Sequence, residues 1–425
     1  MKAVILAAGQ GRRLSGEGVS FPKVLAKVAG RELLYRHLKL LRERGVEEFI
    51  VVVNPWTKGP IKDALLRWGF PFRLVINERP ELGNGYSLLQ ARDYVDGAFF
   101  VVMGDHVYEE AFLDEAIRGQ GLIVDRSGEF IDRDEATKVI LRDGRVRDIG
   151  KDVPGEWYDT GFFILDREIF DHAEAVLKEK GKVEMSDVVK RAELRVTEVS
   201  GRLWLDVDTP QDLKRATRFI VRRSVKPTGD GLISRVINRR LSLLISERLV
   251  NRLSPNQASL LSTLVGLLAS LFASISPPLG GVLYQVSSIL DGTDGEIARS
   301  SMKESAFGGW MDSILDRVVD FSFLLSLGLF LGPRVSWPVV ALAIFGSLMV
   351  SYTSERYRAA TQRDLYEDIP LLLRIGGKRD ERIFLVMLLC LLEMIEECLW
   401  ALALWTNARL LAVLFLVWRK GRKGA

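Results

Sequence analysis

The sequence predicts a two-part protein, in which an α/β domain with a mostly parallel sheet precedes an α-helical membrane domain with six spans. Three observations support this fold class. Strand-like apolar runs alternate with amphipathic helical stretches over residues 1–225. Long, almost uncharged apolar runs follow, and they approach the roughly 20 residues that a bilayer span needs. Between the two lies a basic stretch with Pro and Gly at 222–231, which reads as a linker.

Composition excludes several classes of protein. The chain has 425 residues, of which 48% are hydrophobic and 27% charged, so it is neither disordered nor collagen-like. Its 59 Lys and Arg against 55 Asp and Glu give a charge of +4, which argues against a dedicated nucleic-acid binder. Two cysteines and three histidines make a disulfide scaffold or a zinc site unexpected. We therefore expect chemistry that depends on carboxylates and metal ions.

The start of the chain does not resemble a signal peptide, so we expect the first domain in the cytoplasm. Asn and Gln together number only 14. Such thermolabile residues are depleted in hyperthermophile proteins, which hints at a source of that kind.

The order of elements in the first half predicts its topology. Strands are expected at residues 2–8, 48–53, 72–76 and 98–103, and helices at 33–44, 61–68 and 86–94. This alternation predicts a mostly parallel sheet with helices on both faces. In such sheets ligands bind beyond the carboxyl ends of the strands. The Gly-rich turn 9–13 and the pair Gly104–Asp105 both fall at such ends.

These two motifs suit a nucleoside triphosphate. Gly9 and Gly11 allow backbone N–H groups to approach a phosphate chain, and Arg13 and Lys23 would neutralise it. Asp105 can hold the Mg²⁺ that bridges phosphate oxygens. A Gly-x-Gly turn by itself is more often just a tight turn.

Further motifs give this turn a specific meaning. Residues 6–14, with Pro22–Lys23, resemble the signature of the sugar-1-phosphate nucleotidyltransferase superfamily, and the likeness continues at Gly104–Asp105, Lys151, 159–161 and 204–213. The resemblance implies a Rossmann-like nucleotidyltransferase domain. It also implies that Arg13 and Lys23 are catalytic and bind the triphosphate together with Gly9 and Gly11, that Lys151 contacts the sugar phosphate, and that the metal is held by Asp105 with Asp206 or Asp208. Asp206 occupies the Trp-x-Asp position of the family and is favoured, although the spacing leaves Asp208 open.

The segment 83–87 lines the base pocket in this family. It looks most like the cytidylyltransferase branch, which implies CTP as the nucleotide and assigns Asn84, Tyr86 and Ser87 to CTP binding. The alternative for Asn84 and Tyr86 is an Asn-Gly turn with a packed aromatic ring.

Residues 226–253 are expected to form the linker and an amphipathic helix, followed by a membrane domain over 254–425. Apolar residues recur at helical spacing from Leu232 to Leu249, with arginines between them. Such a helix suits the membrane interface, where Arg meets lipid phosphates. The alternative is an ordinary amphipathic helix packed on its own domain.

Six membrane spans are expected, at about 256–275, 278–298, 307–331, 337–355, 382–397 and 399–418. The last two are poorly separated, since Glu393, Glu396 and Glu397 interrupt them. Six spans put both termini on the same, cytoplasmic side of the cell membrane. The basic tail 419–423 and the basic loop 356–382 agree with the positive-inside rule.

Aspartates within the predicted spans carry the strongest chemical signal. Asp291 and Asp294 are three residues apart and Asp312 and Asp316 are four apart, so each pair projects from one helical face. Two facing pairs would make a cage for two divalent cations such as Mg²⁺ or Mn²⁺. The alternative is ion pairing with Arg299 and Arg317, which is the preferred explanation only for Asp320.

Residues 291–316 match the signature of CDP-alcohol phosphotransferases without a gap. This resemblance implies a six-helix membrane enzyme that moves a phosphoalcohol group from a CDP-alcohol to an acceptor hydroxyl and releases CMP. It implies that Asp291, Asp294 and Asp312 bind metal and that Asp316 binds metal or is the general base. The residues implied for CDP binding are Asn256, Gly295, Arg299 and Gly308.

The fusion of the two halves resembles the family of bifunctional inositol-1-phosphate cytidylyltransferases and di-myo-inositol-phosphate phosphate synthases. The resemblance implies synthesis of a compatible solute: CTP and inositol-1-phosphate give CDP-inositol, which reacts with a second inositol-1-phosphate. It also implies a lipid bilayer as the environment, no nucleic-acid partner, and a homodimer. The alternatives are a phospholipid synthase with a vestigial or regulatory first domain, and a transporter or scaffold that senses nucleotide.

An anionic acceptor needs cations near the aspartates. Four basic residues on the predicted cytoplasmic side could bind its phosphate: Arg356, Lys378, Arg379 and Arg382. The competing explanation is the ordinary positive charge of a cytoplasmic loop.

Overall fold

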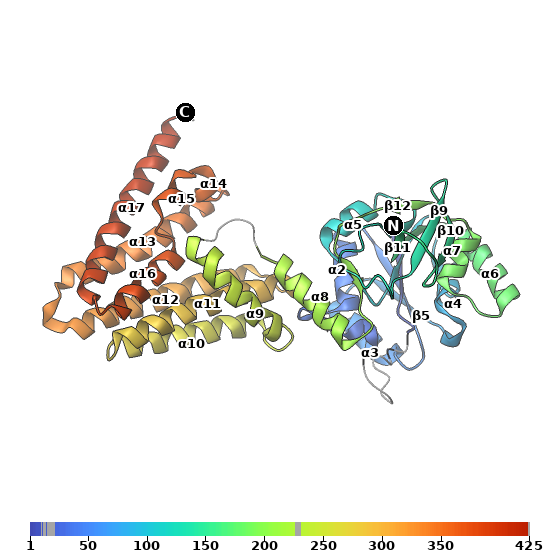
Figure 1. The fold of residues 1–425 in the computed structure, drawn as a ribbon, viewed down its shortest axis with the longest axis horizontal. Coiled ribbons are helices and arrows are strands. Elements are labelled where there is room, and N and C mark those ends of the chain that lie inside the picture. Colours follow the sequence, from blue (N-terminus) through green and yellow to red (C-terminus); the bar gives the residue numbers. More distant parts are fainter. Residues whose placement is uncertain (10, 12–13, 15–21, 226–230, 424–425) are drawn as a thin grey trace. The chain divides into compact units, whose positions relative to one another are not determined.

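The structure is a computed structural model that describes residues 1–425 apart from 10, 12–13, 15–21, 226–230 and 424–425. The chain forms two compact units, Met1–Ile220 and Val221–Ala425. Among the described residues, strands occur only in the first unit, and the second is helical (Figure 1).

The first unit is built on a sheet of nine strands. They are β1 (Lys2–Leu6), β4 (Glu48–Val53), β5 (Phe72–Ile76), β6 (Phe99–Met103), β8 (Gly121–Asp125), β9 (Lys138–Arg142), β10 (Arg145–Gly150), β11 (Trp157–Leu165) and β12 (Val196–Glu198). The strands β6, β1, β4 and β5 are parallel neighbours, and β11 joins β6 in antiparallel orientation. The four strands expected from the sequence and their parallel arrangement are therefore confirmed.

Both faces of this sheet are buried. Side chains alternate between the two faces along a strand, and the whole run from Ala3 to Leu6 is buried. The helices α4 (Asn84–Leu89), α6 (Ile169–Lys180) and α7 (Met185–Arg191) contribute to the core on one face. Figure 1 shows α2 (Leu33–Arg42), α3 (Lys58–Trp68) and α5 (Glu110–Ala116) on the other side. The unit ends within α8 (Pro210–Arg223).

The register of β1 and β6 brings two of the expected motifs to one edge. Leu6 lies opposite Met103, so the turn after β1 and the turn after β6 start side by side. The Gly104 N–H donates to the Leu6 carbonyl at 3.0 Å, and a Cβ at position 104 would lie 2.7 Å from that oxygen. Glycine is therefore needed here, and it sets Asp105 beside the Gly9 turn.

The described residues of the first unit also form two short antiparallel pairs and three 3₁₀ turns. The pairs are β2 (Lys27–Val28) with β3 (Arg31–Glu32), and β7 (His106–Tyr108) with β13 (Trp204–Asp206). The turns are η1 (Lys23–Leu25), η2 (Pro80–Leu82) and η3 (Arg92–Tyr94). The helix expected over 86–94 is shorter than expected, because α4 ends at Leu89 and η3 follows it.

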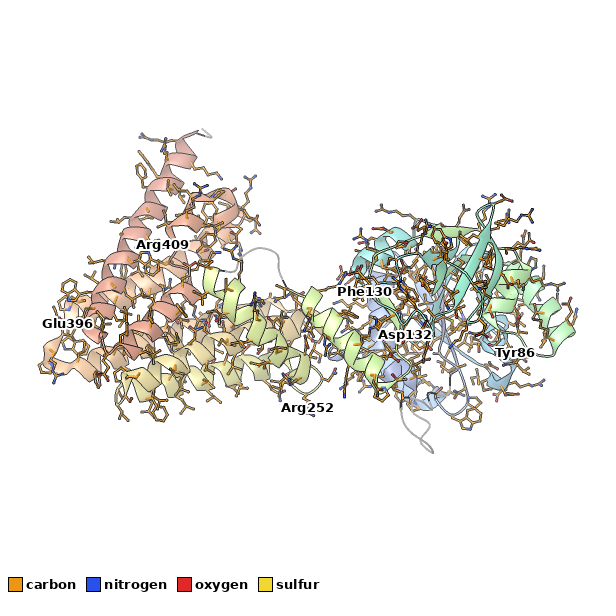
Figure 2. The ribbon with its side chains drawn as sticks, in the orientation of Figure 1. Tyr86, Phe130, Asp132, Arg252, Glu396 and Arg409 are labelled. Atoms are coloured by element: carbon orange, nitrogen blue, oxygen red, sulfur yellow. The ribbon has the colours of Figure 1, made fainter. Side chains whose placement is uncertain are left out.

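The second unit contains a short π-helical turn, η4 (Ser234–Asn238), followed by helices. These are α9 (Arg239–Leu249), α10 (Pro255–Ala273), α11 (Pro277–Ser300), α12 (Ala306–Leu331), α13 (Trp337–Thr361), α14 (Leu365–Asp368), α15 (Leu371–Ile375), α16 (Arg379–Leu391) and α17 (Ile395–Lys423), with the turn η5 (Gly332–Arg334) before α13. Arg409 on α17 is buried (Figure 2) and donates to the Tyr366 hydroxyl at 3.3 Å. This contact links α17 to α14.

The faces of α10 are distributed as in a membrane helix. Its small residues, among them Ser262, Gly266 and Ala269, are buried, whereas Leu260 and Leu271 are exposed. A Cβ at Gly266 would lie 2.5 Å from a methyl group of Val319 on α12. Small residues that let helices approach closely, with large apolar residues facing outward, are typical of packing in lipid.

Within the part of the chain that the structure describes, three helical segments are long and apolar enough to cross a membrane: Pro255–Ala273, Trp337–Thr361 and Ile395–Lys420. Of the other expected spans, α11 and α12 carry the aspartates within their length. The helix α16 has 13 residues, or roughly 20 Å at 1.5 Å per residue. It stops at Leu391, short of the expected end at 397, because the chain turns at Glu393, where φ is 57°.

Two candidate active sites

The first candidate site lies at the carboxyl edge of the parallel strands. Lys23 precedes it at the start of η1, and its ammonium group donates to Asp105 Oδ2 at 2.8 Å and also contacts Asp208 Oδ1. Burial alone would lower the pKa of Lys23, but the two carboxylates raise it overall. Burial would likewise raise the pKa of Asp105, and the charges of Lys23 and His106 lower it well below its usual range. The structure thus joins three of the expected residues in one charged network.

Asp206 lies close to this network but outside the lysine contact. In the β7–β13 pair it stands opposite His106, whose Nδ1 is 2.8 Å from Asp105 Oδ1. Burial raises the pKa of Asp206, while His106 opposes that rise. Although the sequence favoured Asp206 over Asp208 as the second metal ligand, it is Asp208 that shares the lysine with Asp105.

His106 and Asp159 are site residues to which the sequence assigned no role. The ring of His106 stacks on Trp204 with centroids 6.2 Å apart. Asp159 is half-buried, and its desolvation raises its pKa; it accepts the Gly161 N–H at 2.8 Å. Gly161 has φ of +69°, and a Cβ there would lie 2.8 Å from His106 Nε2. The Asp-Thr-Gly motif at 159–161 was the signal that could have identified this wall of the site.

The Gly-rich turn is only partly described. Gly9 is exposed, and a Cβ at its position would meet nothing within 4 Å, so its backbone is open to a ligand. Gly11 has φ of 63°. Arg13 lies outside the described residues. Lys151 is exposed in the turn after β10.

The segment expected to bind CTP is held by internal contacts. Asn84 Oδ1 accepts the Met185 N–H at 2.7 Å, and Ser87 Oγ accepts from the buried Asn77 side chain at 2.9 Å. Tyr86 is half-buried against the core (Figure 2). A Cβ at Gly85 would lie 2.6 Å from Val183. These contacts fit the alternative of a turn with a packed aromatic, and they fix the backbone of the segment that the sequence expects to line the base pocket.

The second candidate site is a cluster of aspartates between α11 and α12. Carboxylate oxygens of Asp291, Asp312 and Asp316 lie within 4.8 Å of one another. Asp294, one turn from Asp291, accepts from the Ser259 hydroxyl of α10 and from the Gly295 N–H. The cluster offers several hard oxygen ligands in a small volume, which fits a divalent cation.

Arg379, the first residue of α16, is inserted into this cluster. Its guanidinium lies 2.7 Å from Asp316, 3.1 Å from Asp291 and 3.1 Å from Asp320. The positive charge of the Arg379 guanidinium therefore balances the negative charge of these aspartates.

Asp320 has a structural environment. Its side chain is 3% exposed and accepts from the Tyr284 hydroxyl at 2.7 Å. Arg317 lies 3.7 Å and Arg382 3.8 Å from it. The ion-pairing alternative thus describes Asp320 well, although Arg299 takes no part, since its Nε donates to the Ser224 carbonyl.

Two cavities flank the aspartates. One, of about 290 Å³, is lined by Asp294 and Asp312 and by all four residues expected to bind CDP: Asn256, Gly295, Arg299 and Gly308. We call it the donor cavity.

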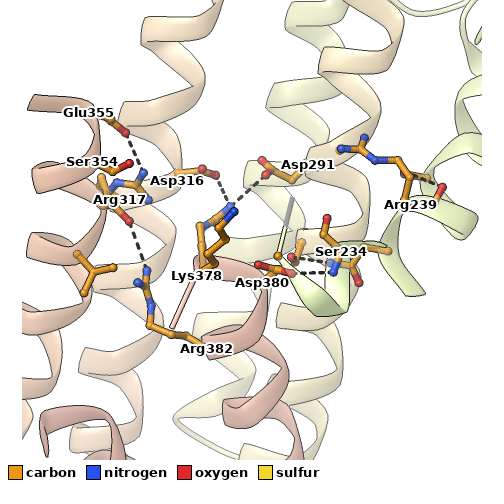
Figure 3. A pocket seen from close by; sticks show the side chains of 18 of the residues that line it. Ser234, Arg239, Asp291, Asp316, Arg317, Ser354, Glu355, Lys378, Asp380 and Arg382 are labelled. Carbon is orange, nitrogen blue, oxygen red and sulfur yellow. Dashed lines mark hydrogen bonds and ion pairs between the residues drawn. The ribbon is translucent and has the colours of Figure 1, made fainter. Parts of the chain in front are cut away.

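The other, of about 320 Å³, is lined by Asp291 and Asp316 and by three of the residues expected to bind the acceptor phosphate: Lys378, Arg379 and Arg382 (Figure 3). We call it the acceptor cavity. The fourth expected residue, Arg356, is exposed and lies outside this lining, whereas its neighbours Ser354 and Glu355 belong to it. A helix turns about 100° per residue, so adjacent positions cannot all face the cavity.

Comparison with known proteins follows the same division. Residues 3–191 match the family model of the MobA-like NTP transferase domain, and residues 252–418 match that of CDP-alcohol phosphatidyltransferase. A solved structure described as the inositol-1-phosphate CTP transferase from T. maritima is 27% identical, with a TM-score of 0.47, over 51% of this chain and 94% of that one.

Two curated relatives match across both units. The bifunctional IPC transferase and DIPP synthase of Aquifex aeolicus is 49% identical over 98% of each chain. That of Thermococcus kodakarensis is 47% identical over 99% of this chain and 98% of its own length. The chain therefore belongs to the family of bifunctional IPC transferases and DIPP synthases.

Proposed function

We propose that this chain catalyses two consecutive reactions. The first unit converts CTP and inositol-1-phosphate to CDP-inositol and pyrophosphate. The second unit joins CDP-inositol to another inositol-1-phosphate, giving di-myo-inositol-phosphate phosphate and CMP, for the synthesis of a compatible solute. The observation that carries the proposal is the pair of cavities that meet at one aspartate cluster, one lined by the CDP-binding signature and the other by cations.

In the first unit, we propose that Asp105 and Asp208 hold a divalent cation, Mg²⁺ or Mn²⁺, with Asp206 beside them. Their common contact with one lysine supports this pairing. Lys23, Gly9, Gly11 and Arg13 would bind the triphosphate, with Lys23 moving from the carboxylates to phosphate oxygens. Asn84, Tyr86 and Ser87 would border the base, and Lys151 the sugar phosphate. The sugar phosphate oxygen then attacks the α-phosphorus, and the bond to pyrophosphate breaks.

In the second unit, Asp291, Asp294, Asp312 and Asp316 would hold divalent cations, and the donor set fits two. When bound, such ions neutralise phosphate charge and stabilise the departing CMP. The donor cavity binds the CDP moiety and the acceptor cavity binds the phosphorylated acceptor. Asp316 faces the acceptor side, which suits a general base.

The transfer can be written as a displacement. The acceptor hydroxyl oxygen attacks the phosphorus that bears inositol, while Asp316 takes the hydroxyl proton. The bond between this phosphorus and the CMP oxygen breaks, and CMP leaves. Arg379, which contacts Asp316 at 2.7 Å, would hold that carboxylate in position before attack.

We further propose that α10, α11, α12, α13, α16 and α17 span the cell membrane, with both termini and the first unit in the cytoplasm, and that the enzyme acts as a homodimer. The exposed leucines of α10 support contact with lipid. Aspartates in α11 and α12 face the cavities rather than lipid.

Incubation of the detergent-solubilised protein with CTP, inositol-1-phosphate and Mg²⁺ tests the proposal. The expected products are pyrophosphate, CMP and a water-soluble diinositol phosphate, identified by mass spectrometry. A product that forms only when CDP-diacylglycerol is added, and that extracts into organic solvent, would support a phospholipid synthase instead. If the protein converts CTP to any product, this argues against the alternative of a transporter or scaffold.

A further inference from the structure

The helical segment before the first long helix forms a wall of the acceptor cavity. This segment consists of η4 and α9, and it contributes Ser234, Asn238, Arg239 and Ser242 to the lining. Three of the four lie within two turns, so one face of the segment borders the cavity. Its residues precede the aspartate signature by about 50 positions in the sequence.

This segment is attached through its polar face. Glu296 on α11 is fully buried and accepts from Ser242 Oγ at 2.6 Å, Ser246 Oγ at 2.6 Å and Arg239 at 2.7 Å. In contrast, Leu241 and Leu244 are 43% and 44% exposed. The apolar side of α9 is thus left for lipid, and the polar side is fixed on the catalytic helix.

The start of the segment is held by α16. Asp380 Oδ2 accepts the Ser234 N–H at 2.7 Å, and Glu381 Oε1 accepts the Leu232 N–H at 3.1 Å. Asn238 adds a contact with α11, since its Oδ1 accepts from Gln285 at 2.7 Å. The segment is therefore fixed at both ends of the cavity wall by hydrogen bonds to two other helices.

This arrangement places the cationic side chain of Arg239 in the lining of the acceptor cavity. Its guanidinium lies beside Gly292, where an added Cβ would be 3.7 Å from a terminal nitrogen. Figure 3 shows it directed toward the side of the pocket that holds Asp291. Gly292 directly follows Asp291, so Arg239 borders the aspartate cluster from the side opposite Arg317 and Glu355.

The arginines on the other side of the cavity form ion pairs with the aspartates and with Glu355. Arg379 contacts Asp291 and Asp316, and Arg317 lies between Asp320 and Glu355. Arg239 is paired with Glu296, a carboxylate outside the aspartate cluster, whose charge is shared with two serine hydroxyls. A planar guanidinium held in this way matches the oxygens of a phosphate monoester.

We propose that Arg239 is a specificity-determining residue of the membrane reaction, which recognises the phosphate monoester of the acceptor polyol, and that Glu296 is the positioning residue that holds it. The inference rests on the proposed function. The segment of η4 and α9 is then part of the active site as well as a membrane anchor.

The test measures the membrane reaction on supplied CDP-inositol, with inositol-1-phosphate and with free inositol as acceptors. R239Q should raise the KM for inositol-1-phosphate about tenfold or more, which corresponds to about 1.4 kcal/mol. The KM for CDP-inositol and the kcat/KM for free inositol should stay within about twofold of the wild type. R240Q is the matched control, since Arg240 is the adjacent arginine and is exposed; it should behave as the wild type.

Glu296 is tested by the same measurements. E296Q should raise the KM for inositol-1-phosphate in the same direction as R239Q, and the double variant should be no worse than R239Q alone. R239K, which keeps the charge but not the planar fork, should restore part of the affinity. If E296Q does not fold, R239Q and R239K still decide the role of Arg239.

Two results would overturn the inference. One is an R239Q enzyme with unchanged preference for the phosphorylated acceptor, and the other is an equal loss of kcat with both acceptors. A wild-type enzyme that cannot use inositol-1-phosphate as acceptor would instead refute the proposed function, and the inference with it.

Discussion

The carboxylates around Lys23 differ in position although they are chemically alike. Asp208 contacts the lysine that also binds Asp105, whereas Asp206 faces His106. We expect D208N to reduce pyrophosphate release more strongly than D206N. Loss of a group outside the direct ligand set typically costs about 10–100-fold, so D206N should stay within that range and D208N should exceed it.

The measurement is pyrophosphate release from CTP and inositol-1-phosphate over a range of Mg²⁺ concentrations. D208N should need more Mg²⁺ for half-maximal activity than the wild type. A larger loss of pyrophosphate release in D206N than in D208N would show that Asp206, and not Asp208, is the metal ligand.

Asp316 and Asp320 lie one helical turn apart and should respond differently to the same substitution. D316N should lower turnover of supplied CDP-inositol by about 10²–10⁴-fold, the usual contribution of a general base, with little change in donor KM. D320N should instead lower thermal stability, because the arginines around it would lose the negative charge of a buried carboxylate. Kinetics and a melting curve of both variants separate the two roles. If D316N keeps the turnover of the wild type, a residue other than Asp316 is the general base.

At the scale of single residues, the sequence identified site residues that lie only a few positions apart in the chain. The intervals of three and four between the aspartates predicted that each pair shares a helical face. It could not show that Arg379 enters the cluster, since Arg379 and Asp291 are 88 residues apart. The Ser242–Glu296 contact spans 54 residues and was missed for the same reason. Arg356 was expected to bind the acceptor phosphate because of its charge and its place near the cytoplasmic end of a predicted span, without knowledge of which face of α13 it occupies.

Close packing between helices governs the second unit. Gly266 lets α10 approach α12, where an added Cβ would be 2.5 Å from Val319. G266L should therefore lower the melting temperature in detergent markedly, since overpacking typically costs about 1–3 kcal/mol. L264A on the exposed face of the same helix is the control and should change little. Equal melting temperatures for G266L and the wild type would show that this approach is not tight.

At the scale of elements, strands were predicted better than helix ends. The apolar runs of β1, β4, β5 and β6 are local signals and were found within two residues of their bounds. The strands β8, β11 and β12 join the sheet through pairings distant in sequence, such as β12 with β8 and β11 with β6. The end of α16 was missed because Leu392 continues the apolar pattern, although Glu393 turns the backbone.

At the scale of the whole molecule, the two units differ in which side chains they bury. The first unit buries both faces of a sheet, as a water-soluble enzyme does. The second buries small and polar residues and exposes leucines, as a protein in lipid does. On the proposed function, CDP-inositol is the product of one unit and the donor for the other, so inactivating either unit should leave the other competent.

The most direct test of this claim is product analysis of two complementary variants, D105N and D316N, each incubated with CTP, inositol-1-phosphate and Mg²⁺. We expect D316N to release pyrophosphate and accumulate CDP-inositol without CMP. We expect D105N to release no pyrophosphate, yet to form CMP and the diinositol product when CDP-inositol is supplied, and a mixture of the two variants to restore the full sequence from CTP. If folded D105N loses the reaction with supplied CDP-inositol as well, or if D316N accumulates no CDP-inositol, the account of two separate sites linked by this intermediate is wrong.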